Sequence, residues 1–441
     1  MCYSDQAPAS GEAQREEGSA VRPATARGFR DVLLDEAAER EAVAASLVAV
    51  FDSWGYSPVE TPVVESHEVM AAAGPEGGEA APFRLLDSDG ELLALRPDMT
   101  LPIARVAATR LADDAGPLRV RYLAPVFREH ASFRGQARQF TQAGVELIGA
   151  NGPAADAEIV ALAAEALRAV GLTEFTIAIG SVEVLHAFVD AAGMPERWGT
   201  AVLRAAHARN LPEVRRLAAE PGVPAEVADA LARVLRTRGG ADAIDACRAA
   251  LSACGRPGAA DGLAETFSIL EGIGCSDVVV VDFGTVRSFG YYTGMVMQVY
   301  APGLGLPVGG GGRYDRLLAA YDRPAPAAGF AIGLERLMIA LAEAGATPKA
   351  KRVDAVVGGL DRAACFAGAA ALRQAGWRVV LACGATSLEL VRAAERVDAF
   401  EAIEAADGAL YRLDRAGGRA DRVGEPPDQP PSRRFSGRRR P

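Results

Sequence analysis

The chain has 441 residues, enough for two or three domains at roughly 150 residues each. Half of the residues are hydrophobic and the formal net charge is −10, values that fit a globular protein and exclude a disordered or collagen-like chain. The acidic balance argues against a main task of binding nucleic acid through a basic face. No apolar run is long enough to span a bilayer and the N-terminal segment lacks a signal core, so we expect a soluble, cytoplasmic protein.

The cysteines and histidines form no metal or redox motif. No two of the six cysteines have the two-residue spacing of a zinc ribbon or redox site, and the four histidines are scattered. We therefore expect free thiols in a reducing cytosol, and no metal or cofactor.

The N-terminal third begins with a polar arm and continues with a helix and two strand pairs. Residues 1–25 are small and polar, which predicts disorder. From Asp35 apolar residues recur at helical spacing, which predicts a helix, and Gly55 marks its C-terminal end. FRLLDSDGELLALRP, from residue 83, predicts a hairpin, and 120–149 predicts two strands with a longer, basic connection.

The middle of the chain mixes helices with strands. Residues 155–171 predict an amphipathic helix, and 182–273 predict an all-helical insertion with breaks such as Gly239-Gly240. DVVVVDFG and YYTGMVMQVYAPG predict strands. VGGGGRYDRLLAAY, from residue 308, predicts a glycine loop entering a helix, and AAGFAIGLERLMIALAEAG predicts a strand or turn passing into one.

The C-terminal part predicts a small separate domain. TPKAKR at 347–352 is typical of a linker, and a β-α-β pattern follows, so we expect a small α/β domain over 352–420. Residues 421–441 hold Pro, Arg, Ser and Gly with little apolar content, which predicts a disordered tail.

Two segments carry polar groups that suit a small charged ligand. In Leu95-Arg-Pro-Asp-Met-Thr100 an arginine, a carboxylate and a hydroxyl could clamp a zwitterion, although the segment taken alone favours an ordinary turn after a strand. Gln142 and Glu146 project from one face of a strand that follows Arg128. A bound polar ligand or a structural hydrogen-bond network would satisfy them.

Two further segments are less specific alone. In Arg287-Ser-Phe-Gly-Tyr-Tyr-Thr-Gly294 one tyrosine hydroxyl could face a pocket, or both rings could simply favour a strand. The glycines at 309–312 and in Gly329-Phe-Ala-Ile-Gly-Leu-Glu-Arg336 could approach a phosphate or form flexible turns. Neither segment is a Walker loop or a dinucleotide fingerprint.

As an ordered set, these segments resemble the core of class II histidyl-tRNA synthetases and of their paralogues, the regulatory subunits of ATP phosphoribosyltransferase. The likeness extends from about Arg27 to Gly345 and includes Gly28-Phe-Arg-Asp31, Trp54-Gly-Tyr56 and Thr61-Pro62. It implies an α+β fold with a class II synthetase-like antiparallel sheet core over residues 26–346. It also implies that 352–420 is a vestigial anticodon-binding-like domain.

Individual positions favour the regulatory paralogue. Synthetases have Leu-Arg-Pro-Glu-Gly-Thr where this chain has the Asp-Met form, which resembles the regulatory subunits. His130, Ser132 and Gln136 stand where a synthetase grips ATP and the tRNA end, and Gly290 replaces an acidic residue. Arg287 and Arg336, together with the shortened C-terminal domain, keep a working histidyl-tRNA synthetase as the competing hypothesis.

The resemblance implies a non-catalytic subunit that is required for the first step of histidine biosynthesis and for feedback inhibition by histidine. Its partners would be a short-form ATP phosphoribosyltransferase catalytic subunit, L-histidine as effector and a second copy within a hetero-oligomer, with no nucleic acid or membrane. Asp98, Thr100 and Gln142 would hold the charged ends of histidine, and Glu146 with the tyrosines would read the imidazole. The full implied site is Asp98, Thr100, Arg128, Gln142, Glu146, Arg287, Tyr291 and Tyr292. A stand-alone amino-acid-binding paralogue with another partner is a third hypothesis.

Overall fold

The computed structural model describes residues 24–71, 82–114, 116–129, 137–285, 292–349 and 352–423. They form two compact units, one containing residues 40–347 and the other the residues from 348 onward. Each unit has its own sheet and hydrophobic core, and each is described by itself.

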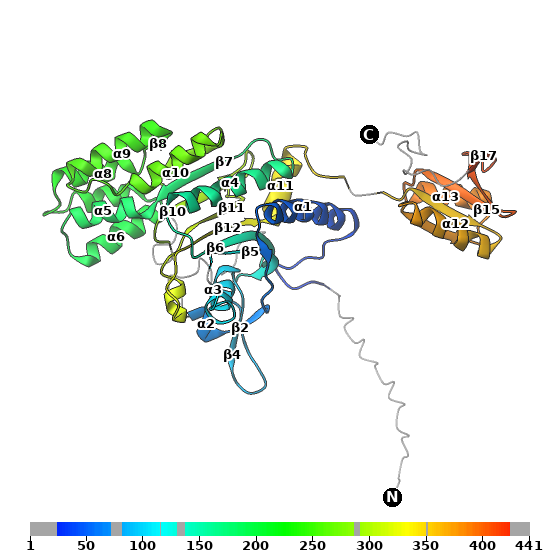
Figure 1. Cartoon of the computed structure of the whole chain (residues 1–441), viewed down its shortest axis with the longest axis horizontal. Coiled ribbons are helices and arrows are strands. Elements are labelled where there is room, and N and C mark those ends of the chain that lie inside the picture. The colour runs from blue at the N-terminus through cyan, green and yellow to red at the C-terminus, as the bar shows by residue number, and fades with distance from the viewer. Residues whose placement is uncertain are drawn as a thin grey trace, which may run out of the picture. The chain divides into compact units, whose positions relative to one another are not determined.

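A nine-stranded sheet organises the larger unit (Figure 1). Its neighbours are antiparallel except for two parallel pairs, β1 with β5 and β7 with β9. In spatial order the strands are β1 (Ser57–Pro58), β5 (Leu118–Phe127), β6 (Gln139–Ile148), β12 (Ala327–Gly333), β11 (Gly309–Arg313), β10 (Met295–Tyr300), β7 (Thr176–Ser181), β9 (Val279–Asp282) and β8 (Arg238–Gly239). The expected α+β fold with a largely antiparallel core is confirmed.

Helices α1 (Leu34–Ser53), α4 (Pro153–Ala169) and α11 (Leu334–Glu343) pack into one core cluster with the sheet. The helix expected from Asp35 is confirmed, and Gly55 follows it with the positive φ of +79° that glycine adopts most readily. Alternation along β6 sends Ala143, Val145 and Leu147 into this cluster. The intervening residues of β6 therefore face the other side of the sheet, where the candidate site lies.

The other face of the sheet is covered by α3 (Thr100–Thr109) and a small antiparallel sheet. That sheet has the order β2 (Val64–Ser66), β4 (Leu92–Leu95), β3 (Arg84–Leu86), with α2 (His67–Ala71) after β2. The predicted hairpin at 83–97 is confirmed as β3 and β4. A second core cluster joins Met99 and Ile103 to Tyr122 of β5 and Tyr314, which follows β11.

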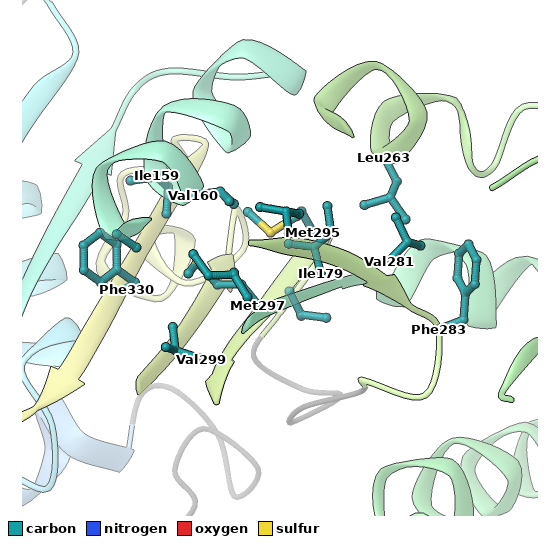
Figure 2. Close-up of a cluster of buried hydrophobic side chains, with 14 of the residues drawn as sticks. Ile159, Val160, Ile179, Leu263, Val281, Phe283, Met295, Met297, Val299 and Phe330 are labelled. Atoms are coloured by element: carbon teal, nitrogen blue, oxygen red, sulfur yellow. The ribbon is translucent and has the colours of Figure 1, made fainter. Parts of the chain in front are cut away.

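Six helices follow β7. They are α5 (Val182–Ala191), α6 (Glu196–His207), α7 (Leu211–Ala218), α8 (Ala225–Val234), α9 (Ala241–Ala253) and α10 (Asp261–Gly272). The region is not all-helical, because Arg238 and Gly239 form the edge strand β8, which pairs with β9. Figure 2 shows Leu263 of α10 beside Val281 of β9, in the core that joins these helices to the sheet.

The predicted glycine loop at 309–312 is wrong, because these glycines form the interior strand β11, followed by the short 3₁₀ helix η1 (Leu318–Tyr321). Close packing between strands explains the glycines. A Cβ on Gly311 would lie 2.0 Å from the carbonyl oxygen of Gly329 on β12 and 2.6 Å from the Cα of Phe330. A glycine run is thus compatible with a central strand when neighbouring backbones approach this closely.

The smaller unit is an α/β domain (Figure 1, orange). Its sheet has the order β14 (Val379–Cys383), β13 (Ala355–Gly359), β15 (Glu401–Ala406), β16 (Ala409–Leu413), β17 (Arg419–Val423). Helices α12 (Arg362–Gln374) and α13 (Ser387–Arg396) pack into two separate core clusters with it. β13 and β14 are parallel, which confirms the predicted β-α-β unit. The expected start of the tail at 421 is wrong, because β17 extends to the buried Val423.

Candidate functional site

Glu146, in the middle of β6, is the centre of the candidate site. It is 1% exposed, and three hydroxyl groups point at its carboxyl group. The hydroxyls of Thr100 and Tyr122 donate to Oε1, over 2.9 Å and 3.3 Å respectively, and the hydroxyl of Tyr314 donates to Oε2. These donors come from α3, from β5 and from the turn after β11, so three separate elements converge on one side chain.

Burial sets the protonation of this carboxyl group. Loss of hydration raises the pKa of Glu146 to about 8 from 4.5, and the neighbouring charge of Asp98 acts in the same direction. The hydrogen bonds from Tyr314 and Thr100 oppose the shift but do not cancel it. At neutral pH the side chain therefore carries a proton for most of the time.

Gln142 lies four residues before Glu146 on β6 and on the same face of the strand. It is 7% exposed, and its Oε1 atom has no hydrogen-bond partner among the described residues. Buried amide oxygens are almost always hydrogen-bonded, so this atom marks a place for an external donor.

Asp98, Arg128 and Tyr292 are three further residues of the implied site that the structure describes. Asp98 precedes α3, and its carboxylate accepts from the backbone N–H of Leu101 over 3.3 Å. Arg128 donates from Nε to the carbonyl oxygen of Pro97, next to Asp98, over 2.9 Å and lies over the ring of Phe140. Tyr292 packs between the two core clusters of the larger unit.

Electrostatic effects on Tyr122 link several of these groups. Asp98 and Tyr292 both raise the pKa of Tyr122, after the larger effects of its burial and of Glu146. The structure thus brings together Asp98, Thr100, Glu146 and Tyr292 around Tyr122. Arg287 and Tyr291, and also His130, Ser132, Gln136 and Gly290, lie outside the described residues.

Two residues of the site were missed in the sequence. Tyr122 lies two residues along β5 from Val120, the residue that pairs with Glu146, and itself pairs with Gly144. Alternation along β5 was the signal that could have identified it. Tyr314 was visible in Gly-Gly-Arg-Tyr-Asp, but the interpretation of that segment as a loop concealed its position beside Glu146.

A glycine opposite Glu146 makes room for its carboxyl group. Gly329 of β12 pairs with Glu146, and a Cβ there would lie 1.8 Å from Oε2 and 2.4 Å from the carbonyl oxygen of Val145. Any larger residue would displace either the carboxyl group or the backbone. The glycine of Gly329-Phe-Ala-Ile-Gly therefore serves the site rather than a flexible turn.

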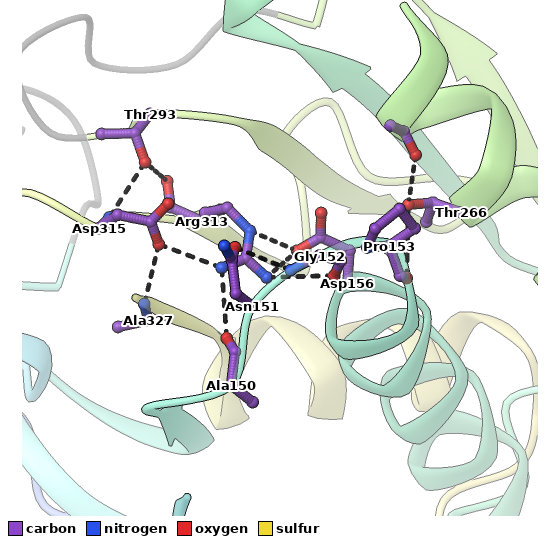
Figure 3. A network of polar contacts seen from close by, with 11 residues as sticks. Ala150, Asn151, Gly152, Pro153, Asp156, Thr266, Thr293, Arg313, Asp315 and Ala327 are labelled. Carbon is purple, nitrogen blue, oxygen red and sulfur yellow. Dashed lines mark hydrogen bonds and ion pairs between the residues drawn. The ribbon is translucent and has the colours of Figure 1, made fainter. Parts of the chain in front are cut away.

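Two arginines of the predicted motifs have structural roles instead. Arg96 is buried and donates to the carbonyl oxygens of Thr61, over 2.6 Å, and of Pro125, over 2.9 Å, so it does not act as part of a ligand clamp. Arg313 forms an ion pair with Asp156 at 2.7 Å and another with Asp315 at 3.1 Å (Figure 3). This network fixes β11 to the start of α4.

An open cleft of about 460 Å³ begins beside the site at Tyr292 and Thr293. Its other walls carry both signs of charge, including Glu183 and Asp190 of α5 and the basic Arg256 and Arg316. The described residues contain no group of His, Cys, Asp or Glu that could hold a metal ion. Buried carboxyl, hydroxyl and amide groups next to charged groups suit a small zwitterion with a polar side chain.

Comparisons with known proteins point to one family. A family model described as histidyl-tRNA synthetase matches residues 28–337. The ATP phosphoribosyltransferase regulatory subunit of Moorella thermoacetica is 41% identical over 357 residues, which cover 80% of this chain and 90% of that protein. The protein of the same name from Symbiobacterium thermophilum is 42% identical over 363 residues, 80% of this chain and 89% of its own.

Solved structures agree with this assignment. A crystal structure described as an ATP phosphoribosyltransferase regulatory subunit/histidyl-tRNA synthetase from Bacillus halodurans has a TM-score of 0.74 and 32% identity, covering 84% of this chain and 95% of that one. Histidyl-tRNA synthetase from Nostoc also has a TM-score of 0.74, over 91% of this chain and 97% of its own. At 23% identity that likeness shows the fold alone. None of the helices in the described residues has the length and apolar content needed to cross a membrane.

Proposed function

The chain belongs to the family of ATP phosphoribosyltransferase regulatory subunits, and from this membership we propose that it senses histidine for the catalytic subunit of that enzyme. It acts in a hetero-oligomer with a short-form catalytic subunit in the cytoplasm, at the first step of histidine biosynthesis. Two copies of the chain pair through the region that contains Trp54-Gly-Tyr56. The larger unit binds histidine and performs no chemistry on it.

The observation that carries the proposal is that Glu146 and Gln142 lie on the same face of β6. One face of β6 carries the buried, protonated carboxyl group of Glu146 and the unpartnered amide oxygen of Gln142. The backbones of these two residues are about 13 Å apart, given roughly 3.3 Å per residue. That span fits the two ends of an amino acid with a ring side chain. The amide oxygen accepts from the ligand's ammonium group, and Asp98 supplies the compensating charge.

The hydroxyl groups around Glu146 suit an imidazole ring. Imidazole presents two nitrogen atoms, one of which donates and the other accepts when the ring is neutral. Glu146 and the hydroxyls of Tyr314 and Thr100 can meet either need, because a hydroxyl both donates and accepts. Arg128 and Arg287 would hold the ligand's carboxylate, and the Tyr291-Tyr292 segment would read the ring.

Feedback follows if histidine binds two states of the complex with different affinities. A ligand shifts an equilibrium only by the difference between its affinities for the two states. Histidine bound at Glu146 therefore inhibits when it favours a state in which the catalytic subunit is less active. The catalytic subunit contacts a surface other than the buried site, so assembly does not require histidine.

Histidine binding to the purified chain, measured by titration calorimetry, tests this proposal directly. Gln142→Met keeps the size of the side chain and removes the amide oxygen, so the affinity should fall about tenfold, the equivalent of roughly 1.4 kcal/mol. Gln139→Met, at the exposed start of the same strand, is the matched control and should bind normally. Absence of histidine binding by the unaltered chain, or normal binding by a folded Gln142→Met variant, would contradict the proposed site.

Partner binding needs a separate experiment. A tagged copy of this chain, expressed with a short-form catalytic subunit, should retain that subunit through purification. The reconstituted complex should be more active than the catalytic subunit alone and should be inhibited by histidine. A chain that binds histidine but retains no catalytic subunit would instead support the stand-alone amino-acid-binding hypothesis.

A further inference from the structure

Two cysteines that no sequence motif connects meet in the smaller unit. Cys365 lies in the first turn of α12 and is fully buried, whereas Cys383 ends β14 and is half-buried. The strand β13 links them, because Gly359 pairs with Cys383 and its carbonyl oxygen accepts from the Cys365 thiol over 3.6 Å. The side chain of Cys383 also packs against the core cluster that contains Cys365.

Their surroundings give the two thiols different chemistry. The strands packed against α12 present apolar side chains to the core around Cys365, among them Val357 and Ile403. Burial, reinforced by the neighbouring Cys383 and by Asp361, raises the pKa of Cys365 to about 11. Cys365 is therefore a protected thiol, and Cys383 is the one that a reagent in solution reaches first.

The remaining described cysteines are not arranged in this way. Burial alone raises the pKa of Cys247, on α9. Cys254 has the charged neighbours Glu226 and Arg233, and Cys275 has Arg168 and Asp277. None of these three has another thiol among its interacting groups, so they serve as internal references for Cys365 and Cys383.

We propose that Cys365 and Cys383 form a reversible intramolecular disulfide when a small-molecule disulfide such as oxidised glutathione is the oxidant. The Cys383 thiolate attacks one sulfur of the oxidant, forming a mixed disulfide and releasing one glutathione thiolate, which takes up the proton lost by Cys383. The Cys365 thiolate then attacks the Cys383 sulfur and releases the second glutathione, which is protonated in turn. Two protein thiols are oxidised and one glutathione disulfide is reduced to two thiols.

The bond would join the first turn of α12 to the end of β14, both at the carboxyl ends of the parallel strands. A crosslink that restricts the unfolded chain raises stability. The proposal rests on contacts within the smaller unit and not on the histidine site, so its outcome is independent of the proposed function.

Peptide mapping of the full-length chain tests the proposal. The reduced protein is incubated with oxidised glutathione, its free thiols are capped with N-ethylmaleimide, and it is digested with trypsin without reduction. The expected product links peptide 363–373 to peptide 379–392, while Cys247, Cys254 and Cys275 are recovered capped or bound to glutathione. Dithiothreitol should release the two peptides, and the oxidised chain should melt at a higher temperature than the reduced one.

Three variants make the test decisive. Cys365→Ala should accumulate a stable mixed disulfide between glutathione and Cys383, and Cys383→Ser should show no change in melting temperature with oxidant. Cys254→Ser, also at a half-buried thiol, should behave like the unaltered chain. Recovery of Cys365 as a capped thiol, with Cys383 unmodified or still bound to glutathione in the unaltered chain, would overturn the proposal.

Discussion

Glu146 couples the candidate site to the stability of the fold. Burial raises its pKa from 4.5 to about 8, so the folded state binds a proton that the unfolded chain has already released. The stability associated with this group is fully present below pH 4.5 and is lost as the pH rises through 8. The loss should approach about 1.4 kcal/mol per pH unit where the two states differ by a whole proton.

The variant Glu146→Gln has no proton to lose at this position. Between pH 5 and pH 8 its free energy of unfolding, measured by urea denaturation, should fall less steeply than that of the unaltered chain. Glu60→Gln, at an exposed position, is the control and should follow the unaltered chain. Parallel curves for all three proteins would show that Glu146 does not titrate in this range.

Truncation of the same side chain should separate activation from feedback. In the reconstituted complex, Glu146→Ala should raise the inhibitory concentration of histidine about 10- to 150-fold, for a loss of roughly 1.5–3 kcal/mol of binding. Activity without histidine should persist under the proposal that the catalytic subunit contacts another surface.

A histidine titration beside a melting curve distinguishes this outcome from a structural one. A variant that unfolds or fails to assemble would identify Glu146 as a structural carboxyl group. A stable, active variant with unchanged sensitivity would remove Glu146 from the histidine site.

The contact between β11 and α4 depends on one buried ion pair. The side chains of Arg313 and Asp156 are only 6% and 10% exposed, and Arg313 also reaches Asp315 (Figure 3). Asp156→Ala should lower the free energy of unfolding by about 3–5 kcal/mol, because it leaves a buried guanidinium group without its main partner.

The double variant Asp156→Leu with Arg313→Met removes both charges. Replacing both members of a buried pair by apolar groups costs much less than removing one, so the double variant should be more stable than Asp156→Ala. Urea denaturation of the three proteins measures this. A double variant less stable than the single one would show that the pair itself stabilises the contact.

The last strand of the smaller unit determines where its C-terminus can be shortened. Removal of residues 421–441 would take the buried Val423 out of the core that includes α12, and should cost about 1.5–3 kcal/mol. Removal of residues 424–441 keeps Val423 and takes away mostly Pro, Arg, Ser and Gly. Thermal melting of the two truncated chains should show a loss only for the longer deletion; equal melting temperatures would show that β17 contributes no stability.

The purified chain as a whole should not catalyse histidine-dependent exchange between pyrophosphate and ATP. His130 and Gln136 replace a carboxylate and a basic residue of the synthetase pattern, and each lost charge-assisted contact is worth about 1.5–3 kcal/mol. The two together could weaken ATP binding by about 10²-fold or more. Robust exchange at physiological ATP, with a histidyl-tRNA synthetase as positive control, would restore the synthetase hypothesis.

Local patterns in the sequence predicted most elements of the fold correctly. The helix from Asp35, the hairpin around Gly90 and the β-α-β unit of the smaller domain follow from hydrophobic periodicity and turn chemistry, which act between near neighbours. The family assignment also came from ordered motifs. Alternation on β6 correctly placed Gln142 and Glu146 on one face.

Packing between distant segments decided the rest. Whether the glycines at 309–312 form a loop or a strand depends on how closely β12 approaches them, which no local pattern reports. Arg96 and Arg313 bind backbone carbonyls and buried carboxylates rather than a ligand. No local pattern reports this, because Thr61 and Pro125, which accept from Arg96, and Asp156, which pairs with Arg313, are far away in the chain. The hydroxyls of Tyr122 and Tyr314 meet at Glu146, and the thiols of Cys365 and Cys383 meet beside Gly359, only after the strands pair, because strand order is set by the three-dimensional packing of the core.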